Sequence, residues 1–387
     1  MNKKAIAILG AIFLLIVGTL GFLVYSKYSS SPAPAPLAVQ PTPTPGSNVG
    51  SNTGTTTPTA TPTPTPASNI VLLTNDQVVS PALFFNGGGI TYFDTQGNLY
   101  QANLQSNNGQ LSLTAKNKLN VPAKPGIVKV FWPAHGNDFI AQINNGGVTS
   151  YSYFNSSAGM YTDLPPQVES LDWMPNGTQI MYVWYQNNKS SLSIGSPDTK
   201  TFTSLAAMWE NDDQIHVSPD GSQVLYFETN SAAPTNFINS VSADGKVFKG
   251  LVKNGQNYGV LWSPDGQKFL FNKKDPSTGN YQLWYDNLTS GAVENLGLFT
   301  GTDKVVWDSG SNIIYAAVPN SAAAGSNALT VDSFYKLDTT TLDKTQYPSS
   351  GTPPVDAQSL FLSSAGDKLF FKNAQDGGLY YLDLTQQ

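Results

Sequence analysis

One signature recurs along residues 69–387 and constrains the fold more than any other feature of the chain. It consists of an apolar strand ending in a large residue, a polar turn with glycine four residues later, and a second apolar strand. The clearest copy is WSPDGQKFLF at residues 262–271, and VSPDGSQVLYF at residues 217–227 is similar. The large residue, here called the repeat anchor, is found at Phe85, Trp132, Trp173, Val217, Trp262, Trp307 and Leu362.

The spacing of the anchors indicates the kind of repeat. Neighbouring anchors lie between 41 residues apart (Trp132 to Trp173) and 55 residues apart (Trp307 to Leu362). This period is typical of propeller blades with four strands each. A second apolar hairpin follows in several repeats, for example at residues 191–205 and 283–296, with Asp, Asn, Ser, Thr and Gly in its turn. We predict an all-β propeller of seven blades. Six or eight blades stay open, because the first repeat is weak and the sixth is long.

The two ends of the repeat region suggest how the ring closes. The seventh repeat stops after its third strand, LYYLDL at residues 379–384, and one apolar segment, NIVLLT at residues 69–74, is left over at the start. We expect residues 69–74 to supply the fourth strand of the last blade. Such closure removes a sheet edge that would otherwise be exposed to aggregation.

The segment before the repeats predicts a membrane anchor and a tether. Lys3 and Lys4 precede an uncharged apolar run at residues 5–25, which is long enough to cross a bilayer. We interpret residues 1–28 as an uncleaved signal anchor, with a cleaved signal peptide as the alternative. Residues 29–68 are rich in proline and threonine and predict an extended, disordered tether. The propeller, residues 69–387, would then lie outside a cell membrane that the chain crosses once, with its N-terminus in the cytoplasm.

Composition excludes several classes of function. The chain has no cysteine and no arginine, two histidines, and a net charge of −6. Without cysteine there are no disulfides, iron–sulfur clusters or thiolate nucleophiles. Without arginine and with net negative charge, nucleic acid is a poor candidate partner. We expect no cofactor, with calcium as an open alternative, and the oligomeric state is not indicated.

A column of residues four positions before the anchors is a candidate ligand site. Ring geometry should bring this column toward one mouth of the central channel, and it contains three acids, Glu169, Asp213 and Asp303. The other candidates at the mouth are Asp212, Tyr258, Lys129 and Lys304. Converging carboxylates can hold calcium, bind sugar hydroxyls, or act as an acid–base pair on a glycan. A solvated rim carrying lysines is the favoured alternative.

The two histidines lie in different parts of the repeats. His135 lies in the turn Pro-Ala-His-Gly and is expected to be exposed. His216 and Asp172 each precede an anchor in neighbouring repeats, so the ring should bring them together. They form either an acid–base pair or a polar contact between packed blades, and we favour the contact. We assign no catalytic and no metal-binding residue.

The Ser-Pro-Asp-Gly turn, preceded by Trp or Val at residues 217–221 and 262–266, resembles the repeat of TolB-type propellers. It is also similar to the WD-like repeats of dipeptidyl-peptidase-IV-type and prolyl-oligopeptidase-type propellers. The peptidases carry a Gly-x-Ser-x-Gly motif that this chain lacks, and TolB has a globular domain where this chain has the predicted anchor and tether. The resemblance therefore implies a fold and no activity.

From these observations we expect a non-catalytic binding or scaffold module for a protein or an envelope glycan. The alternative is a glycan-processing hydrolase or lyase that uses carboxylates at the channel mouth. The chain is more consistent with a binding protein than with an enzyme.

Overall fold

The computed structural model describes residues 69–84, 87–208, 214–228, 236–255, 258–275, 278–320, 329–348 and 353–386. These residues form seven antiparallel sheets of four strands each. The predicted seven-bladed, four-stranded propeller is therefore confirmed. The described residues contain no helix long and apolar enough to cross a membrane. Residues 1–68, where the anchor and the tether are predicted, lie outside them.

Blades 1 to 6 follow the chain in order, each starting with its innermost strand. Blade 1 contains β2 (Val79–Leu83), β3 (Gly89–Phe93), β4 (Leu99–Asn107) and β5 (Gln110–Lys118). Blade 2 contains β6 (Ile127–Phe131), β7 (Phe139–Asn145), β8 (Val148–Asn155) and β9 (Met160–Asp163). Blade 3 contains β10 (Val168–Trp173), β11 (Ile180–Gln186), β12 (Lys189–Gly195) and β13 (Phe202–Met208).

The next three blades have the same layout. Blade 4 contains β14 (Gln214–Val217), β15 (Gln223–Phe227), β16 (Asn236–Ser242) and β17 (Phe248–Gly255). Blade 5 contains β18 (Gly259–Trp262), β19 (Lys268–Lys274), β20 (Tyr281–Asn287) and β21 (Ala292–Asn295). Blade 6 is preceded by the 3-10 helix η1 (Thr302–Lys304) and contains β22 (Val305–Trp307), β23 (Ile313–Pro319), β24 (Asp332–Asp338) and β25 (Lys344–Gln346).

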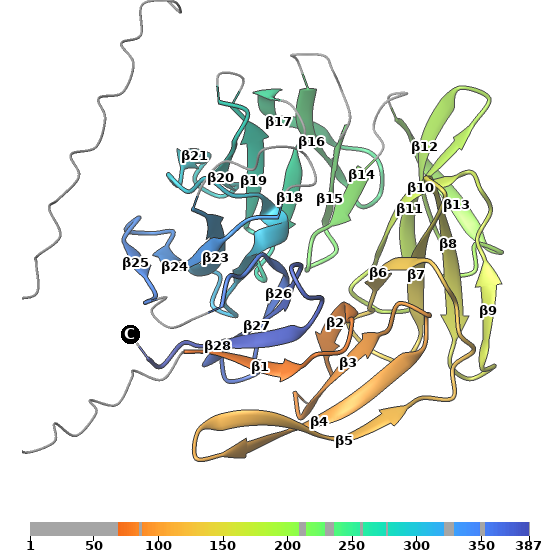
Figure 1. Ribbon diagram of the computed structural model, residues 1–387. Coiled ribbons are helices and arrows are strands. Elements are labelled where there is room, and N and C mark those ends of the chain that lie inside the picture. The colour runs from red at the N-terminus through yellow and green to blue at the C-terminus, as the bar shows by residue number, and fades with distance from the viewer. Residues whose placement is uncertain are drawn as a thin grey trace, which may run out of the picture. The chain divides into compact units, whose positions relative to one another are not determined.

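The last blade combines the two ends of the propeller. Its strands are β26 (Ala357–Leu362), β27 (Lys368–Asn373), β28 (Leu379–Asp383) and, outermost, β1 (Ile70–Thr74). β1 pairs antiparallel with β28, with Ile70 opposite Leu382 and Val71 opposite Tyr381. Figure 1 shows β1, in orange, beside β28, in blue. The inner strands β2 and β26 also contact each other, so the first and last blades are neighbours.

The repeat signature has a local physical cause in its turn. In blades 4 and 5 the glycines Gly221 and Gly266 have positive φ angles of 71° and 66°. Their amides donate to the carbonyls of Ser218 and Ser263, at 2.8 and 2.9 Å. Only glycine adopts this left-handed conformation readily, because it has no Cβ. The glycine four residues after the anchor therefore allows the tight turn between the first two strands of a blade.

Large apolar side chains fill the space between neighbouring blades. The anchors Trp173, Val217, Trp262 and Trp307 are buried, while Trp132 and Leu362 are partly buried. Phe85 lies outside the described residues. The core is divided into clusters that each join two blades, for example the one around Trp262, Phe269 and Phe271. Burial of these apolar side chains stabilises the ring.

Candidate functional site

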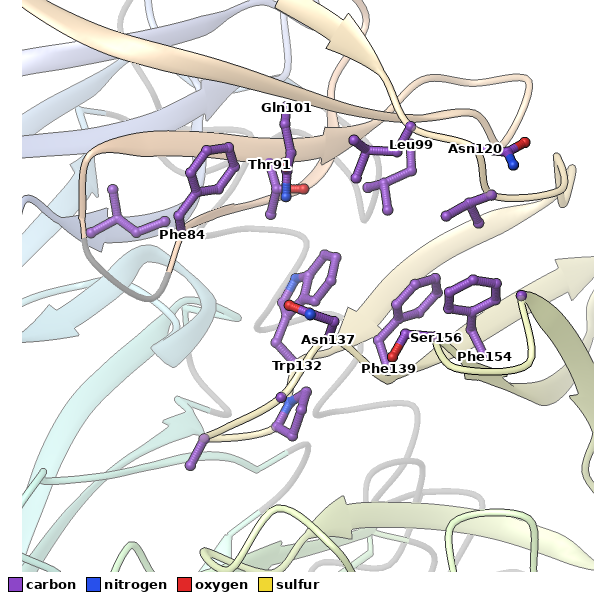
Figure 2. A pocket seen from close by; sticks show the side chains of 17 residues that line it. Phe84, Thr91, Leu99, Gln101, Asn120, Trp132, Asn137, Phe139, Phe154 and Ser156 are labelled. Carbon is purple, nitrogen blue, oxygen red and sulfur yellow. The ribbon is translucent and has the colours of Figure 1, made fainter.

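A cavity of about 510 Å³ lies between blades 1 and 2. Figure 2 shows its two walls facing each other. One wall comes from blade 1 and the segment after it, with Phe84, Thr91, Leu99, Gln101 and Asn120. The opposite wall comes from blade 2, with Trp132, Asn137, Phe139, Phe154 and Ser156. A concave, mostly apolar space with a few polar side chains is the usual form of a small-molecule site.

This cavity coincides with a break in the repeat. The indole Nε1 of Trp173 donates to the carbonyl of Phe131, at 2.8 Å, and so clasps blade 3 to blade 2. The indoles of Trp262 and Trp307 make the same kind of bond to the preceding blade, to His216 and Leu261, at 3.1 and 3.4 Å. The Nε1 of Trp132 is buried and has no hydrogen-bond partner.

In blade 1 the structure places Leu83, and not the predicted Phe85, at the anchor position, because Leu83 pairs with Ile90 as Trp262 pairs with Phe269 in blade 5. The carbonyl equivalent to those of Phe131, His216 and Leu261 is therefore that of Ala82. The amide of Gly87 donates to the carbonyl of Phe84, at 2.8 Å, which is the same turn bond that Gly266 makes to Ser263. The hydroxyl of Tyr161, whose ring packs against Phe139 and Phe154, is also buried without a partner. Two orphaned polar groups therefore belong to the aromatic cluster around this cavity, and a buried polar group without a partner is unfavourable.

The lining determines which ligands suit the cavity. No ionisable side chain is among the residues that line it. The aromatic rings offer apolar faces, and the amides of Gln101, Asn120 and Asn137 offer both donors and acceptors. A bound charge would find no counter-ion there, and burying an unpaired charge is costly. The cavity therefore suits a neutral ligand with apolar faces and hydroxyl or amide groups.

This cavity was not predicted from the sequence. Of the lining residues, only Trp132 has a predicted role, as a repeat anchor. One signal in the sequence was the weakness of the first repeat, which has the glycine-rich segment FFNGGG at residues 84–89 where the fifth repeat has the turn SPDGQK.

The predicted acidic column is only partly described. Asp212 and Asp213 lie outside the described residues. Glu169 lies on β10 in blade 3, and Asp303 lies in η1 at the entry to blade 6. Burial raises the pKa of the Asp303 carboxyl, and the neighbouring Lys304 partly opposes this shift. Among the described residues, no group of three or more His, Asp or Glu side chains is arranged to hold a metal ion.

Two other members of the predicted mouth are buried in the described part of the chain. Tyr258 is 3% exposed and packs edge to face against Phe271 in the core. Lys304 is 9% exposed, and its amine contacts the carboxylates of Asp332 and Asp356, at 2.7 and 2.6 Å. Thr330 accepts a third hydrogen bond from this amine, at 3.0 Å. This ion cluster joins η1 to β24 and to the segment that leads into β26.

Lys129, Asp172 and His216 form a group on the inner strands of blades 2, 3 and 4. The Nδ1 of His216 lies 4.0 Å from the Oδ2 of Asp172, which is beyond hydrogen-bond distance. The carboxylate of Asp172 accepts instead from the backbone amides of Trp173 and Val217, at 2.8 and 3.0 Å. The bond to Val217 links blade 3 to blade 4, as the favoured interpretation of a contact between blades requires. His135 is exposed in its turn.

The charges in this group are shifted by their surroundings. Burial raises the pKa of Asp172 to about 6, opposed by the hydrogen bond from Val217 and by the charge of Lys129. Burial lowers the pKa of His216 to about 3, and Lys129 adds to this shift. At neutral pH the imidazole is therefore neutral and the carboxyl is mostly ionised.

Comparisons with known proteins support the fold. No family model matches the chain, and no curated protein matches its sequence. Among solved structures, it is similar to an oligogalacturonate lyase from Vibrio parahaemolyticus, with a TM-score of 0.57 and 12% identity, covering 81% of this chain and 93% of that one. It is also similar to the β-propeller domain of Cps50 (Swd1) from Myceliophteria thermophila, with a TM-score of 0.54 and 10% identity, covering 81% and 99%.

A third similar structure is TolB from Acinetobacter baumannii, with a TM-score of 0.43 and 15% identity, covering 77% of this chain and 79% of that one. The fold is thus shared with an oligogalacturonate lyase and with the propeller domain of Cps50 (Swd1). At this level of identity the likeness shows the fold alone, and function has to be argued from the site.

Proposed function

We propose that this chain is a membrane-anchored, extracytoplasmic propeller that recognises a neutral part of an envelope glycan in the cavity between blades 1 and 2, without catalysis. The observation that carries the proposal is the chemistry of the lining. The partly exposed rings of Phe84 and Trp132 lie beside amide and hydroxyl side chains, and no ionisable group is among the lining residues. A sugar ring has the matching surface, with apolar C–H faces and a rim of hydroxyl groups.

The same lining favours binding over glycan cleavage at this cavity. Hydrolysis of a glycosidic bond ordinarily needs a pair of carboxyl groups beside the scissile bond. The cavity has no Asp or Glu in its lining. The concave shape also favours a glycan over a protein partner, because protein interfaces are usually broad surfaces of about 800 Å² on each side.

The location belongs to the proposal and rests on the sequence. The apolar run at residues 5–25 would anchor the chain in the membrane. The proline-rich residues 29–68 would hold the propeller away from the external face of that membrane. A glycan of the cell envelope is the polymer within reach of such a tethered domain.

Calorimetric titration of the full chain in detergent tests the proposal. The probes are neutral N-acetylglucosamine and hexose oligomers, compared with uronic acid oligomers of equal length. We expect the neutral oligomers to bind more tightly than the uronic acid oligomers. We also expect Asn137→Ala and Trp132→Ala to weaken binding of the neutral oligomers at least tenfold, about 1.4 kcal/mol.

Trp262→Phe is the matched control, because it changes a repeat tryptophan away from the cavity. If the Asn137 and Trp132 variants bound the neutral oligomers as tightly as the native protein does, the cavity would not be the binding site. Preference for the uronic acid oligomers would contradict the neutral character assigned to the ligand.

A further inference from the structure

The indole of Trp132 carries a donor that the corresponding residues of other blades use for packing. In blades 3, 5 and 6 the anchors Trp173, Trp262 and Trp307 each donate from Nε1 to a carbonyl of the preceding blade. The corresponding acceptor for Trp132 would be the carbonyl of Ala82 on β2. In the described part of the chain, the Nε1 of Trp132 is buried and has no hydrogen-bond partner. Blade 2 therefore keeps a polar donor that the packing of the blades does not use.

This donor belongs to the wall of the cavity between blades 1 and 2. Figure 2 shows the indole of Trp132 directed from blade 2 toward the opposite wall, where Thr91 and Gln101 lie on β3 and β4. An indole N–H donates and does not accept, so its partner has to be an acceptor. A buried donor without a partner is unfavourable, and a ligand that brings an acceptor removes this cost.

The lining around Trp132 indicates which acceptor fits. Leu99 and Phe139 supply apolar surface. The side-chain amides of Gln101 and Asn137 supply hydrogen-bond acceptors. A secondary acetamide matches all of these groups. Its carbonyl accepts from the indole, its methyl group contacts the apolar side chains, and its N–H donates to a side-chain amide oxygen.

Other small substituents of a sugar match this lining less well. A hydroxyl group is an acceptor, but it has no methyl group for the apolar surface. A carboxylate or an ammonium group brings a charge, and no ionisable side chain is among the residues that line the cavity. Burying a charge without a counter-ion is unfavourable. The lining therefore ranks the acetamide first, the hydroxyl second and the charged groups last.

We propose that the Nε1 of Trp132 determines specificity for N-acetylated hexosamines, because it donates to the acetamide carbonyl of one sugar ring. This inference rests on the proposed function, which places a neutral glycan in the cavity, and it names the class of sugar. The ring of Trp132 packs against Phe93 and Phe139, with ring centres 6.3 and 5.2 Å apart. This packing holds the donor in position before the ligand arrives, which favours tight binding.

Calorimetric titration with matched sugars tests the proposal on the full chain in detergent. The probes are trimers of N-acetylglucosamine, glucose and glucosamine with the same linkage, which differ only in the group on the second carbon of each ring. We expect the acetylated trimer to bind at least ten times more tightly than the glucose trimer. The glucosamine trimer, which is positively charged, should bind most weakly.

The variant Trp132→Phe separates the donor from the rest of the lining, because it removes the N–H and keeps an aromatic ring. We expect it to weaken binding of the acetylated trimer at least fivefold and binding of the glucose trimer less than twofold. Trp262→Phe is the matched control, because it removes an indole donor that is bonded to His216, away from the cavity. The control should leave both affinities unchanged.

A second measurement uses the native protein and does not depend on the folding of a variant. The tryptophan side chains are labelled with nitrogen-15, and their indole N–H signals are followed by NMR spectroscopy. Trp132 is the one tryptophan among the residues that line the cavity. We therefore expect one indole signal to move downfield with the acetylated trimer and to move less with the glucose trimer.

The outcomes distinguish this proposal from the proposed function. If neither neutral trimer binds, both proposals are overturned. If the native protein binds the acetylated and glucose trimers equally, or Trp132→Phe weakens both equally, neutral glycan binding stands and the part assigned to the Trp132 donor is overturned. An acetylated trimer that binds without moving any indole signal would also contradict the assignment of this donor.

Discussion

Trp132 and Trp262 occupy the same place in their repeats, but only the indole of Trp262 has a carbonyl partner. Replacing either residue by phenylalanine removes the same atoms. The difference in unfolding free energy between the two variants therefore measures the hydrogen bond of the Trp262 indole. We expect Trp262→Phe to lower the free energy of unfolding by about 1 kcal/mol more than Trp132→Phe. Urea denaturation of both variants measures this. Equal losses would mean that the Nε1 of Trp132 is also bonded.

His216 makes a testable contribution to stability in acid. Its pKa in the folded protein is about 3, below the ordinary value of 6.5, so its contribution is present above pH 6.5 and is lost as the pH falls toward 3. We expect His216→Gln to reduce the loss of unfolding free energy between pH 7 and pH 4. Nearly a third of the side chain is exposed and solvent screens part of the effect, so the change is about 1 kcal/mol.

The control for this experiment is His135→Gln, which changes the exposed histidine of a turn. Asp172 acts in the opposite sense, because its pKa is raised to about 6 and its contribution is lost as the pH rises through that value. The measurement is the denaturation midpoint of the native protein and of the two histidine variants at several pH values. It shows whether His216 causes the loss of stability in acid. Parallel pH curves for all three proteins would contradict the assignment.

The turn between the first two strands of a blade can form without glycine at its left-handed position. In blade 6 the residue four places after the anchor is Ser311, and it adopts the left-handed φ of 60° that glycine has elsewhere. Its hydroxyl accepts from the amide of Asp265, at 3.0 Å, and so joins blade 6 to the turn of blade 5. A contact between blades therefore accompanies the conformational cost of a non-glycine residue there.

The buried ion cluster of Lys304 joins three elements of blades 6 and 7, and its removal should be costly. Lys304→Met leaves Asp332 and Asp356 buried without their cation, and we expect the free energy of unfolding to fall by about 3–5 kcal/mol. Lys200→Met is the control, because Lys200 is exposed and its pair with the partly buried Asp198 should contribute under about 1 kcal/mol. Chemical denaturation measures both. A similar small loss in the two variants would show that the cluster does not hold the blades together.

At the scale of the whole molecule, β1 is the outermost strand of the last blade, and its removal leaves β28 at the sheet edge. We expect a chain that starts at residue 75 to lose at least about 3 kcal/mol of stability, because the apolar side chains of β1 are no longer buried. Its free edge should also promote association, which size-exclusion chromatography detects. A chain that starts at residue 65 keeps β1 and is the matched control. A monomeric, equally stable shorter chain would contradict this role for β1.

Much of the fold was predictable because each blade of a repeated fold has the same pattern of apolar and turn residues in its sequence. Each glycine turn and each anchor is a weak local signal, but regular spacing over seven copies indicated the blade count and the strands per blade. The proximity of Asp172 and His216 was predictable for the same reason, since equivalent positions of neighbouring blades are brought together. The outer position of residues 70–74 follows from counting strands at both ends.

The sequence by itself therefore determined the architecture, since apolar periodicity and turn residues act over a few neighbouring residues. The tertiary structure decided which side chains are satisfied. Lys304 was predicted at an open mouth but is buried between Asp332 and Asp356, residues 28 and 52 positions away. The indole Nε1 of Trp132 lines a cavity and has no partner, although Trp132 occupies the same repeat position as Trp262. Partners and empty spaces depend on contacts between segments far apart in the chain, and no local pattern encodes them.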